Sequence, residues 1–209
     1  MIKISAFESY ASEYEQWFDD HRYVYESELA ALKRLLPQDG LGLEVGVGTG
    51  RFAVQLGIKL GIEPSKAMRE IAQTRHIDAI NAVAEALPFS NNKFDYIVFV
   101  TTVCFLDSLE QAFKEAFRVL KAGGAILIGL IDKDSPLGKD YEKHKNDSHF
   151  YKEATFHSVK EVITCLEKSG FGDFRFVETI FHPLAEIVEK EAIKEGYGTG
   201  AFVVILANK

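Results

Sequence analysis

Residues 41–50 have the sequence LGLEVGVGTG, in which an apolar strand runs directly into three glycines separated by single residues. Gly46, Gly48 and Gly50 can adopt positive φ angles and let a ligand lie against the main chain, because glycine has no Cβ atom. The N–H groups of a helix that begins near Gly50 would point back toward that ligand. A strand, a tight turn and a helix in this order predict a binding corner for a nucleotide-like ligand.

The spacing of the glycines separates two classes of ligand. A dinucleotide site has the pattern G-x-G-x-x-G, which keeps the helix N-terminus clear for a pyrophosphate. In this chain the third glycine comes one residue early, and Arg51 occupies the last position of that pattern. Glu44, at the end of the strand, would repel a pyrophosphate but suits a ligand that carries an ammonium and a sulfonium. A purely structural glycine turn is the alternative.

Composition limits the classes of protein to which the chain can belong. Its 209 residues are 47% hydrophobic, which predicts a single domain over residues 1–209. There are 24 Lys and Arg against 31 Asp and Glu and no basic run, which argues against nucleic acid as a partner. No run of about eighteen apolar residues and no signal-peptide pattern is present, so we expect a cytoplasmic protein without a membrane partner. Cys104 and Cys165 are too few for a disulfide framework or a zinc site, and we expect both to be reduced.

The segment before the first strand, residues 1–37, is predicted to be helical, with a break around residues 19–23 and an end at Pro37. Aromatic side chains recur in it at three- and four-residue spacing: Tyr10, Tyr14, Trp17 and Phe18. These rings could simply cover one edge of the sheet. Alternatively, they form a lid that closes over substrate and excludes water.

The next segment, IKLGIEPS from Ile58, predicts a second short strand that ends at Glu63, after a helix of only about two turns. A carboxylate at this position, beside the end of the first strand, can accept two hydrogen bonds from the hydroxyls of a ribose. Pro64 follows, and Ser65 is predicted as the N-cap of the next helix. Met68 lies one turn into that helix, where its thioether would contact either an adenine or the core.

The remaining sequence continues to alternate strands and helices. We predict a third strand at 80–83, a fourth at 94–100, a helix over 108–121, a glycine turn in LKAGG and a fifth strand. After another helix and a sixth strand, a long return leads to a final apolar strand. Residues 132–156 are polar and interrupt the alternation. Because long ordered loops usually serve a function, we predict that they form a substrate cap.

Five segments in order resemble the class I S-adenosylmethionine-dependent methyltransferases, specifically their small-molecule branch, which includes enzymes of ubiquinone and menaquinone biosynthesis. The segments are LEVGVGTG, GIEPS, AEALPF with FDYIVFV, LKAGG and HFYKEATFHSVKEVITCLEKSGF. The likeness spans nearly the whole chain. It implies an α/β fold with a doubly wound, Rossmann-like sheet of seven strands, the last of them antiparallel.

The resemblance also implies S-adenosylmethionine as the cofactor. It assigns Glu44 to the methionine moiety, the three glycines to the main-chain turn and Glu63 to the ribose, and it places Thr101 near the end of the methionine half. The adenine would lie against a loop formed by Ala84, Glu85, Ala86 and Leu87. The first helix is shorter than is usual in this family, so we expect a clipped helix within the same fold.

Methyl transfer from a sulfonium is an in-line displacement, which chiefly requires a well-placed nucleophile in a dry site. If the acceptor must lose a proton, His21, His149 and Tyr151 are candidate groups because their segments should face the reacting end of the cofactor. The alternative for each, which the sequence favours, is a surface or structural residue. No metal is predicted, since only Asp107 lies near the edge where a metal-assisted enzyme needs clustered acids.

Three alternative functions remain. A nucleic-acid methyltransferase would usually carry an N-P-P-Y or D-P-P-Y motif after the fourth strand, where this chain has VTTVCF. A non-catalytic cofactor-binding protein and a nicotinamide oxidoreductase are the others. We predict a small-molecule substrate, and the motifs select neither its identity nor an oligomeric state.

Overall fold

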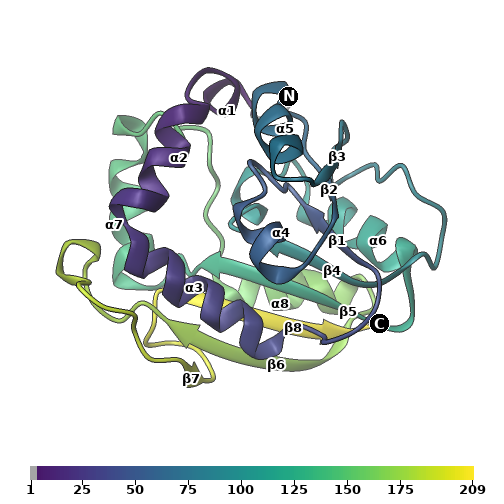
Figure 1. Cartoon of the computed structure of the whole chain (residues 1–209). Helices are drawn as coiled ribbons and strands as arrows, with labels where there is room; N and C mark the ends of the chain where they lie inside the picture. Colours follow the sequence, from purple (N-terminus) through teal and green to yellow (C-terminus); the bar gives the residue numbers. More distant parts are fainter. Residues whose placement is uncertain (1–3) are drawn as a thin grey trace.

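The computed structural model describes residues 4–209, which form one mixed sheet with helices on both faces (Figure 1). The strand order across the sheet is β3-β2-β1-β4-β5-β8-β6-β7. The strands are β1 (Gly42–Val45), β2 (Leu60–Ile62), β3 (Asp78–Ile80), β4 (Phe94–Val100), β5 (Leu120–Ile131), β6 (Gly172–Thr179), β7 (Lys194–Glu195) and β8 (Phe202–Asn208).

The first five strands are parallel, and β8 lies antiparallel between β5 and β6. This arrangement confirms the doubly wound sheet and its antiparallel last strand. The number of strands is the exception, because the sheet has eight strands where seven are predicted. The long return after β6 folds back on the sheet edge, where Lys194 and Glu195 pair with Glu178 and Val177.

Two apolar layers hold helices against the sheet. The helices are α1 (Ser5–Ser9), α2 (Ala11–Asp20), α3 (Arg22–Leu35), α4 (Arg51–Leu56), α5 (Lys66–Thr74), α6 (Leu109–Val119), α7 (Pro136–His144) and α8 (Val159–Lys168). Along β4 the side chains alternate between faces, so Val98 packs in the layer under α3 and α4 whereas Ile97 packs with α6 and α8. A short 3-10 turn, η1 (Val103–Phe105), follows β4.

Helix boundaries follow the signals in the sequence. The N-terminal segment breaks at His21, within the predicted interval, and again at Tyr10. Helix α4, the first helix after the glycine turn, has only six residues, which confirms that it is shortened as predicted. The Ser65 hydroxyl accepts the Met68 N–H as the N-cap of α5, and Ser158 forms a capping box with Glu161 at α8.

Two boundaries differ from the prediction. The third strand is at Asp78–Ile80 rather than 80–83, because the chain turns away after Ile80 into a loop with an isolated bridge between Val83 and Ala86. LKAGG belongs to the irregular start of β5 rather than to a turn before it, and the register with β4 shifts there. Within residues 4–209, no helix is long and apolar enough to span a membrane.

Candidate active site

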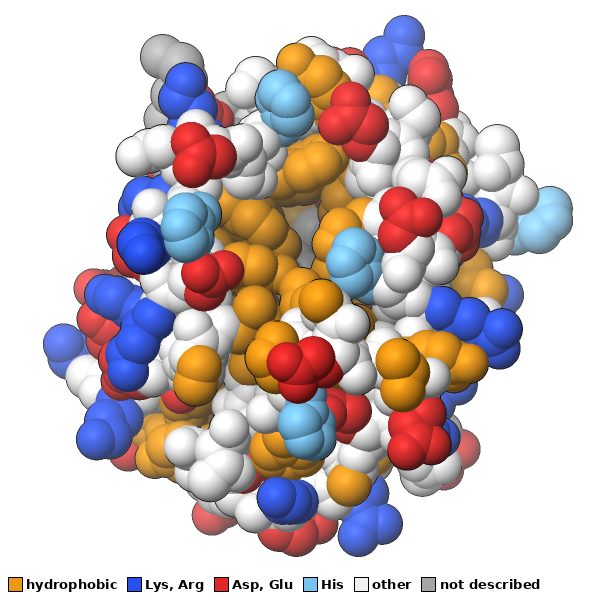
Figure 2. Space-filling view, turned by 90° about the vertical axis from the view of Figure 1, so that its left-hand side faces the viewer, with side chains coloured by type: hydrophobic (Ala, Val, Ile, Leu, Met, Phe, Trp, Pro, Cys, Tyr) orange, Lys and Arg blue, Asp and Glu red, His pale blue; other side chains and the backbone are white. Residues whose placement is uncertain are grey.

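A cavity of about 970 Å³ runs along the edge of the sheet where the parallel strands end. The last residues of four neighbouring strands line it: Val45, Ile62, Val100 and Ile131. On the opposite side it is bordered by α2 and by α7, which lie together at the left of Figure 1. Figure 2, which faces that side, shows a hollow lined by hydrophobic side chains. Ligands bind at this edge in open α/β sheets.

The glycine turn forms the floor of one end of the cavity. Gly46 has φ 71°, and a Cβ atom there would lie 2.4 Å from Cγ2 of Thr102, so only glycine fits. Gly48 has φ 54°, and a Cβ atom there would be in van der Waals contact with the hydroxyl of Tyr14, at 3.6 Å. Gly50 is the left-handed N-cap of α4. The main chain at Gly46 and Gly48 borders the cavity, with the Tyr14 side chain beside Gly48.

Glu63 follows β2 and lines the same end of the cavity. Its side chain holds the turn, because Oε2 accepts the Gly48 N–H at 3.1 Å and Oε1 accepts the Ser65 N–H at 2.9 Å. Burial raises the pKa of the Glu63 carboxyl, while these two hydrogen bonds oppose the rise. A carboxylate has about four acceptor sites, so acceptors remain for a ribose.

Among the predicted cofactor residues, Glu44, Ser65 and Met68 are buried and do not line the cavity. Glu44 is buried in β1, where its Oε2 has no hydrogen-bond partner among the described residues. Burial and the nearby Glu63 raise the pKa of the Glu44 carboxyl well above its usual range. Met68 is fully buried in α5, which favours the core alternative for its thioether.

The predicted adenine loop divides into two parts. Ala84 and Glu85 line the cavity, whereas Ala86 and Leu87 do not. Glu115 on α6 accepts the Leu87 N–H at 2.8 Å, which ties that part of the loop to the helix layer. The Glu85 carboxylate is itself engaged, because it accepts the N–H groups of Asp107 and Ser108 at 2.9 and 3.2 Å.

Thr101 occupies a strained position at the end of β4. It lines the cavity and has φ 51°, a left-handed conformation that a β-branched residue rarely adopts. Its N–H donates to the Gly129 carbonyl at 2.8 Å, which holds the main chain in place. Backbone strain of this kind clusters at functional sites. That Thr101 contacts the methionine half of the cofactor stays a prediction.

Aromatic rings close the other side of the cavity. Tyr14, Trp17 and Phe18 of α2 line it, whereas Tyr10 stacks on His149 at a centroid distance of 4.4 Å. The ring of Phe150, in the polar segment 132–156, lies 6.0 Å from that of Tyr14. The N-terminal helices and this segment therefore meet through their rings over the cavity.

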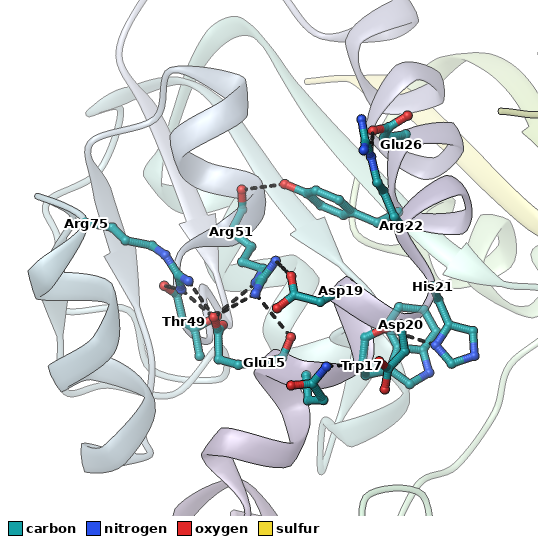
Figure 3. Close-up of polar contacts among 12 residues, drawn as sticks. Glu15, Trp17, Asp19, Asp20, His21, Arg22, Glu26, Thr49, Arg51 and Arg75 are labelled. Carbon is teal, nitrogen blue, oxygen red and sulfur yellow. Dashed lines mark hydrogen bonds and ion pairs between the residues drawn. The ribbon is translucent and has the colours of Figure 1, made fainter. Parts of the chain in front are cut away.

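Ion pairs attach α2 to the glycine turn (Figure 3). The Glu15 carboxylate accepts from Arg51 Nε at 3.1 Å and from Arg75 Nη1 at 3.0 Å, and Arg75 also donates to the Thr49 carbonyl at 2.7 Å. Asp19 accepts from Arg51 as well, at 3.1 Å. Burial opposes the ionisation of Glu15, but the two arginines outweigh it and lower its pKa to about 2.

We expect Glu15→Gln to lower the free energy of unfolding by about 3 kcal/mol at pH 7. Because the folded pKa lies below the unfolded one, this contribution is present above pH 4.5 and is lost as the pH falls toward 2. Urea unfolding of both proteins between pH 3 and pH 7 measures it. Asp19→Asn, at a side chain that is 62% exposed, is the control and should cost less than about 1 kcal/mol. A difference for Glu15→Gln that does not change with pH would contradict the prediction.

Comparison with known proteins identifies the family. The sequence model of the methyltransferase domain family matches residues 43–128. A crystal structure from Thermotoga maritima, described as a SAM-dependent methyltransferase, possible histamine N-methyltransferase, is 50% identical, with a TM-score of 0.96 over 99% of each chain. An uncharacterised protein of Methanocaldococcus jannaschii is 48% identical over 206 residues, 99% of this chain and 100% of that protein. The chain belongs to the class I S-adenosylmethionine-dependent methyltransferases.

A more distant relative is the ubiquinone/menaquinone biosynthesis C-methyltransferase UbiE of Klebsiella pneumoniae. It is 30% identical over 135 residues, which cover 63% of this chain and 49% of UbiE. The residues of this methyltransferase fit the cofactor of its family. The Glu63 carboxylate lies where a ribose is expected and keeps acceptor sites free of the main chain, and the main chain of Gly46 and Gly48 borders the same space.

Of the three predicted proton acceptors in the methyltransferase, only Tyr151 lines the cavity. Burial raises the pKa of its phenol well above the usual range, so the hydroxyl keeps its proton at neutral pH. His21 stacks on Trp17 at 4.6 Å and His149 stacks on Tyr10, and neither lines the cavity. The histidine that does is His144 of α7, which the sequence analysis does not select.

The sequence analysis also does not select two acidic residues of the methyltransferase that the structure brings to this region. Glu15 holds α2 to the glycine turn, and Glu28 of α3 lines the cavity. The burial of Glu28 could have been predicted from the sequence, because it lies four residues from both Val24 and Leu32 on the buried face of its helix. Within residues 4–209, no group of three or more His, Cys, Asp or Glu side chains is arranged to hold a metal ion.

Proposed function

We propose that this methyltransferase transfers a methyl group to a small-molecule acceptor bound in the cavity. The observation that carries the proposal is that one cavity is lined both by Gly48 and Glu63 and by the rings of Trp17, Tyr141 and Tyr151. A volume of about 970 Å³ is at the upper end of small-molecule sites, which leaves room for a cofactor and an acceptor together.

We assign the cofactor to the end of the cavity near the glycine turn. Glu63 would accept the ribose hydroxyls, Ala84 and Glu85 would contact the adenine, and Thr101 would face the methionine half. S-adenosylmethionine supplies an electrophilic methyl group when bound. The residues of the chain would orient the acceptor and exclude water, and the N-terminal helices (1–37) and the segment 132–156 would serve as lid and cap.

The charge of the cavity supports a small molecule rather than a nucleic acid. The exposed carboxylate side chains that line it are Glu13, Asp20, Asp107, Asp140 and Asp147, and no exposed Lys or Arg among the described residues lines it. Phosphate groups need clustered lysines and arginines. We also propose a cytoplasmic location, since two cysteines are too few for the disulfide framework of a small secreted domain.

Isotope transfer tests the proposal. The protein is incubated with methyl-labelled S-adenosylmethionine and, separately, with a low-molecular-mass metabolite extract, total RNA, DNA or denatured protein. We expect label to enter only the metabolite fraction, and a variant with Gly46→Val to transfer none, because the added atoms would collide with Thr102. Label that enters only RNA, DNA or protein would contradict the proposal.

Trp17→Ala distinguishes a lid from simple packing. If the ring closes on the acceptor, the KM for the acceptor found by isotope transfer should rise about tenfold or more, while cofactor affinity changes less than about threefold. Steady-state kinetics and calorimetric titration of S-adenosylhomocysteine measure the two effects. Equal effects on both ligands would indicate that Trp17 only packs against the fold.

A further inference from the structure

Glu28 is a carboxyl group buried in the wall of the cavity. Glu28 lies on α3, which packs against β5, β6 and β8, and only 4% of the residue is exposed. Among the described residues its carboxyl oxygens have no ion-pair or hydrogen-bond partner. The hydroxyl of its neighbour Ser27 accepts the Glu191 N–H. Burying an acid without a partner is costly, and the cost is tolerated where a ligand supplies the partner.

The groups that face Glu28 are phenol rings rather than cations. Tyr14 of α2, Tyr141 of α7 and Tyr151 all line the cavity with it and lie within its electrostatic range. Tyr141 and Tyr151 stack at a centroid distance of 4.9 Å. Two basic side chains line the cavity and each has an acidic partner: Lys145 pairs with Glu142 at 2.7 Å, and His144 lies 3.0 Å from Asp140. A carboxylate among aromatic faces is an environment that binds organic ammonium groups.

The mouth of the cavity also favours a positively charged ligand. Its exposed acids are the five that argue against nucleic acid, and Figure 2 shows acidic side chains around the apolar hollow. Such a ring of negative charge concentrates cations and guides them inward. Rim and interior therefore select a ligand with a positive charge and an apolar body.

We propose that the acceptor of this methyltransferase is an amine with an aromatic or other ring, whose ammonium group pairs with Glu28 while its ring lies among Tyr14, Tyr141 and Tyr151. The inference rests on the proposed function, since it assigns the acceptor class of the same cavity. It makes Glu28, in the wall of the cavity, a residue that determines specificity.

Binding of such a ligand should release a proton. Burial raises the pKa of the empty Glu28 carboxyl to about 8, so at pH 7 most molecules hold a proton there. When an ammonium pairs with the carboxylate, that proton passes to the buffer. Titration calorimetry in two buffers with different ionisation enthalpies measures the number of protons released.

The experiment uses the protein saturated with S-adenosylhomocysteine. Three amines, histamine, tyramine and 2-phenylethylamine, are titrated, together with 2-phenylethanol, which has the same ring but no charge. We expect at least one amine to bind with release of close to one proton, and 2-phenylethanol to bind about 30-fold or more weakly than 2-phenylethylamine. Glu28→Gln should remove both the preference and the proton release.

Glu26→Gln is the matched control, because Glu26 lies on the same helix and pairs with Arg22 outside the cavity. It should bind the amines as the wild type does. If S-adenosylhomocysteine itself does not bind, the proposed function fails. If it binds but no amine does, or if Glu28→Gln binds the amines as tightly as the wild type, this inference is overturned while the proposed function stands.

Discussion

Replacing Glu63 with Ala is expected to weaken S-adenosylhomocysteine binding about 100-fold or more. The carboxylate would lose two charge-assisted hydrogen bonds to the ribose, each worth about 1.5 to 3 kcal/mol at most. The same change removes the acceptor of the Gly48 N–H, so the turn that supports the ligand also loosens. Titration calorimetry on wild type and variant measures the loss.

Two further variants separate binding from folding. Glu63→Gln keeps one carbonyl acceptor and should give an intermediate affinity. Glu70→Ala changes an exposed acid on α5 that pairs with Lys66, and it should bind as the wild type does. Affinity of Glu63→Ala within about threefold of wild type, in a protein with normal circular dichroism, would remove Glu63 from the ribose site.

Replacing Glu28 with Gln is expected to stabilise the empty protein by an amount that grows with pH. Its pKa is about 8 in the folded state against 4.5 for an unperturbed Glu, so the folded protein holds a proton that the unfolded chain releases. The stability of the wild type is therefore highest below pH 4.5 and falls as the pH rises through 8. The amide variant lacks this loss, which amounts to roughly 4 to 5 kcal/mol in total.

Urea unfolding at several pH values between 5 and 9, without ligand, measures the effect. The stability difference between Glu28→Gln and wild type should increase by about 1.4 kcal/mol per pH unit between 5 and 8 and then become constant. Glu26→Gln should stay within about 0.5 kcal/mol of wild type throughout. A pH-independent difference for Glu28→Gln would mean that Glu28 is not a buried, protonated acid.

The sequence is sufficient to predict the fold because its local signals agree with its global pattern. The strand before Gly46 and the glycine turn are correctly predicted, and so are the N-cap at Ser65 and the fourth strand at 94–100. Strand β7 is not predicted, because Lys194 and Glu195 have no strand propensity of their own. Only their tertiary position beside β6 makes them a strand.

The site is predictable where the main chain builds it and less so where side chains from distant segments meet. Glu63 is placed on the cavity by its position after a strand, a local property. Whether a histidine faces the cavity depends on how α2 and α7 pack, and His144 rather than His21 does. The partners of Glu15 lie 36 and 60 residues away in sequence, so no motif reveals them.

A crystal structure of the wild-type protein with S-adenosylhomocysteine tests the central claim most directly. The claim is that one cavity holds the cofactor at the glycine turn and leaves its other end for an acceptor. It predicts that the ribose hydroxyls bind the Glu63 carboxylate and that the ligand lies against the main chain of Gly48. It also predicts that the sulfur points toward the space between Tyr14, Glu28 and Tyr151. A ligand bound away from Glu63, or one that fills the space beside Glu28, would contradict it.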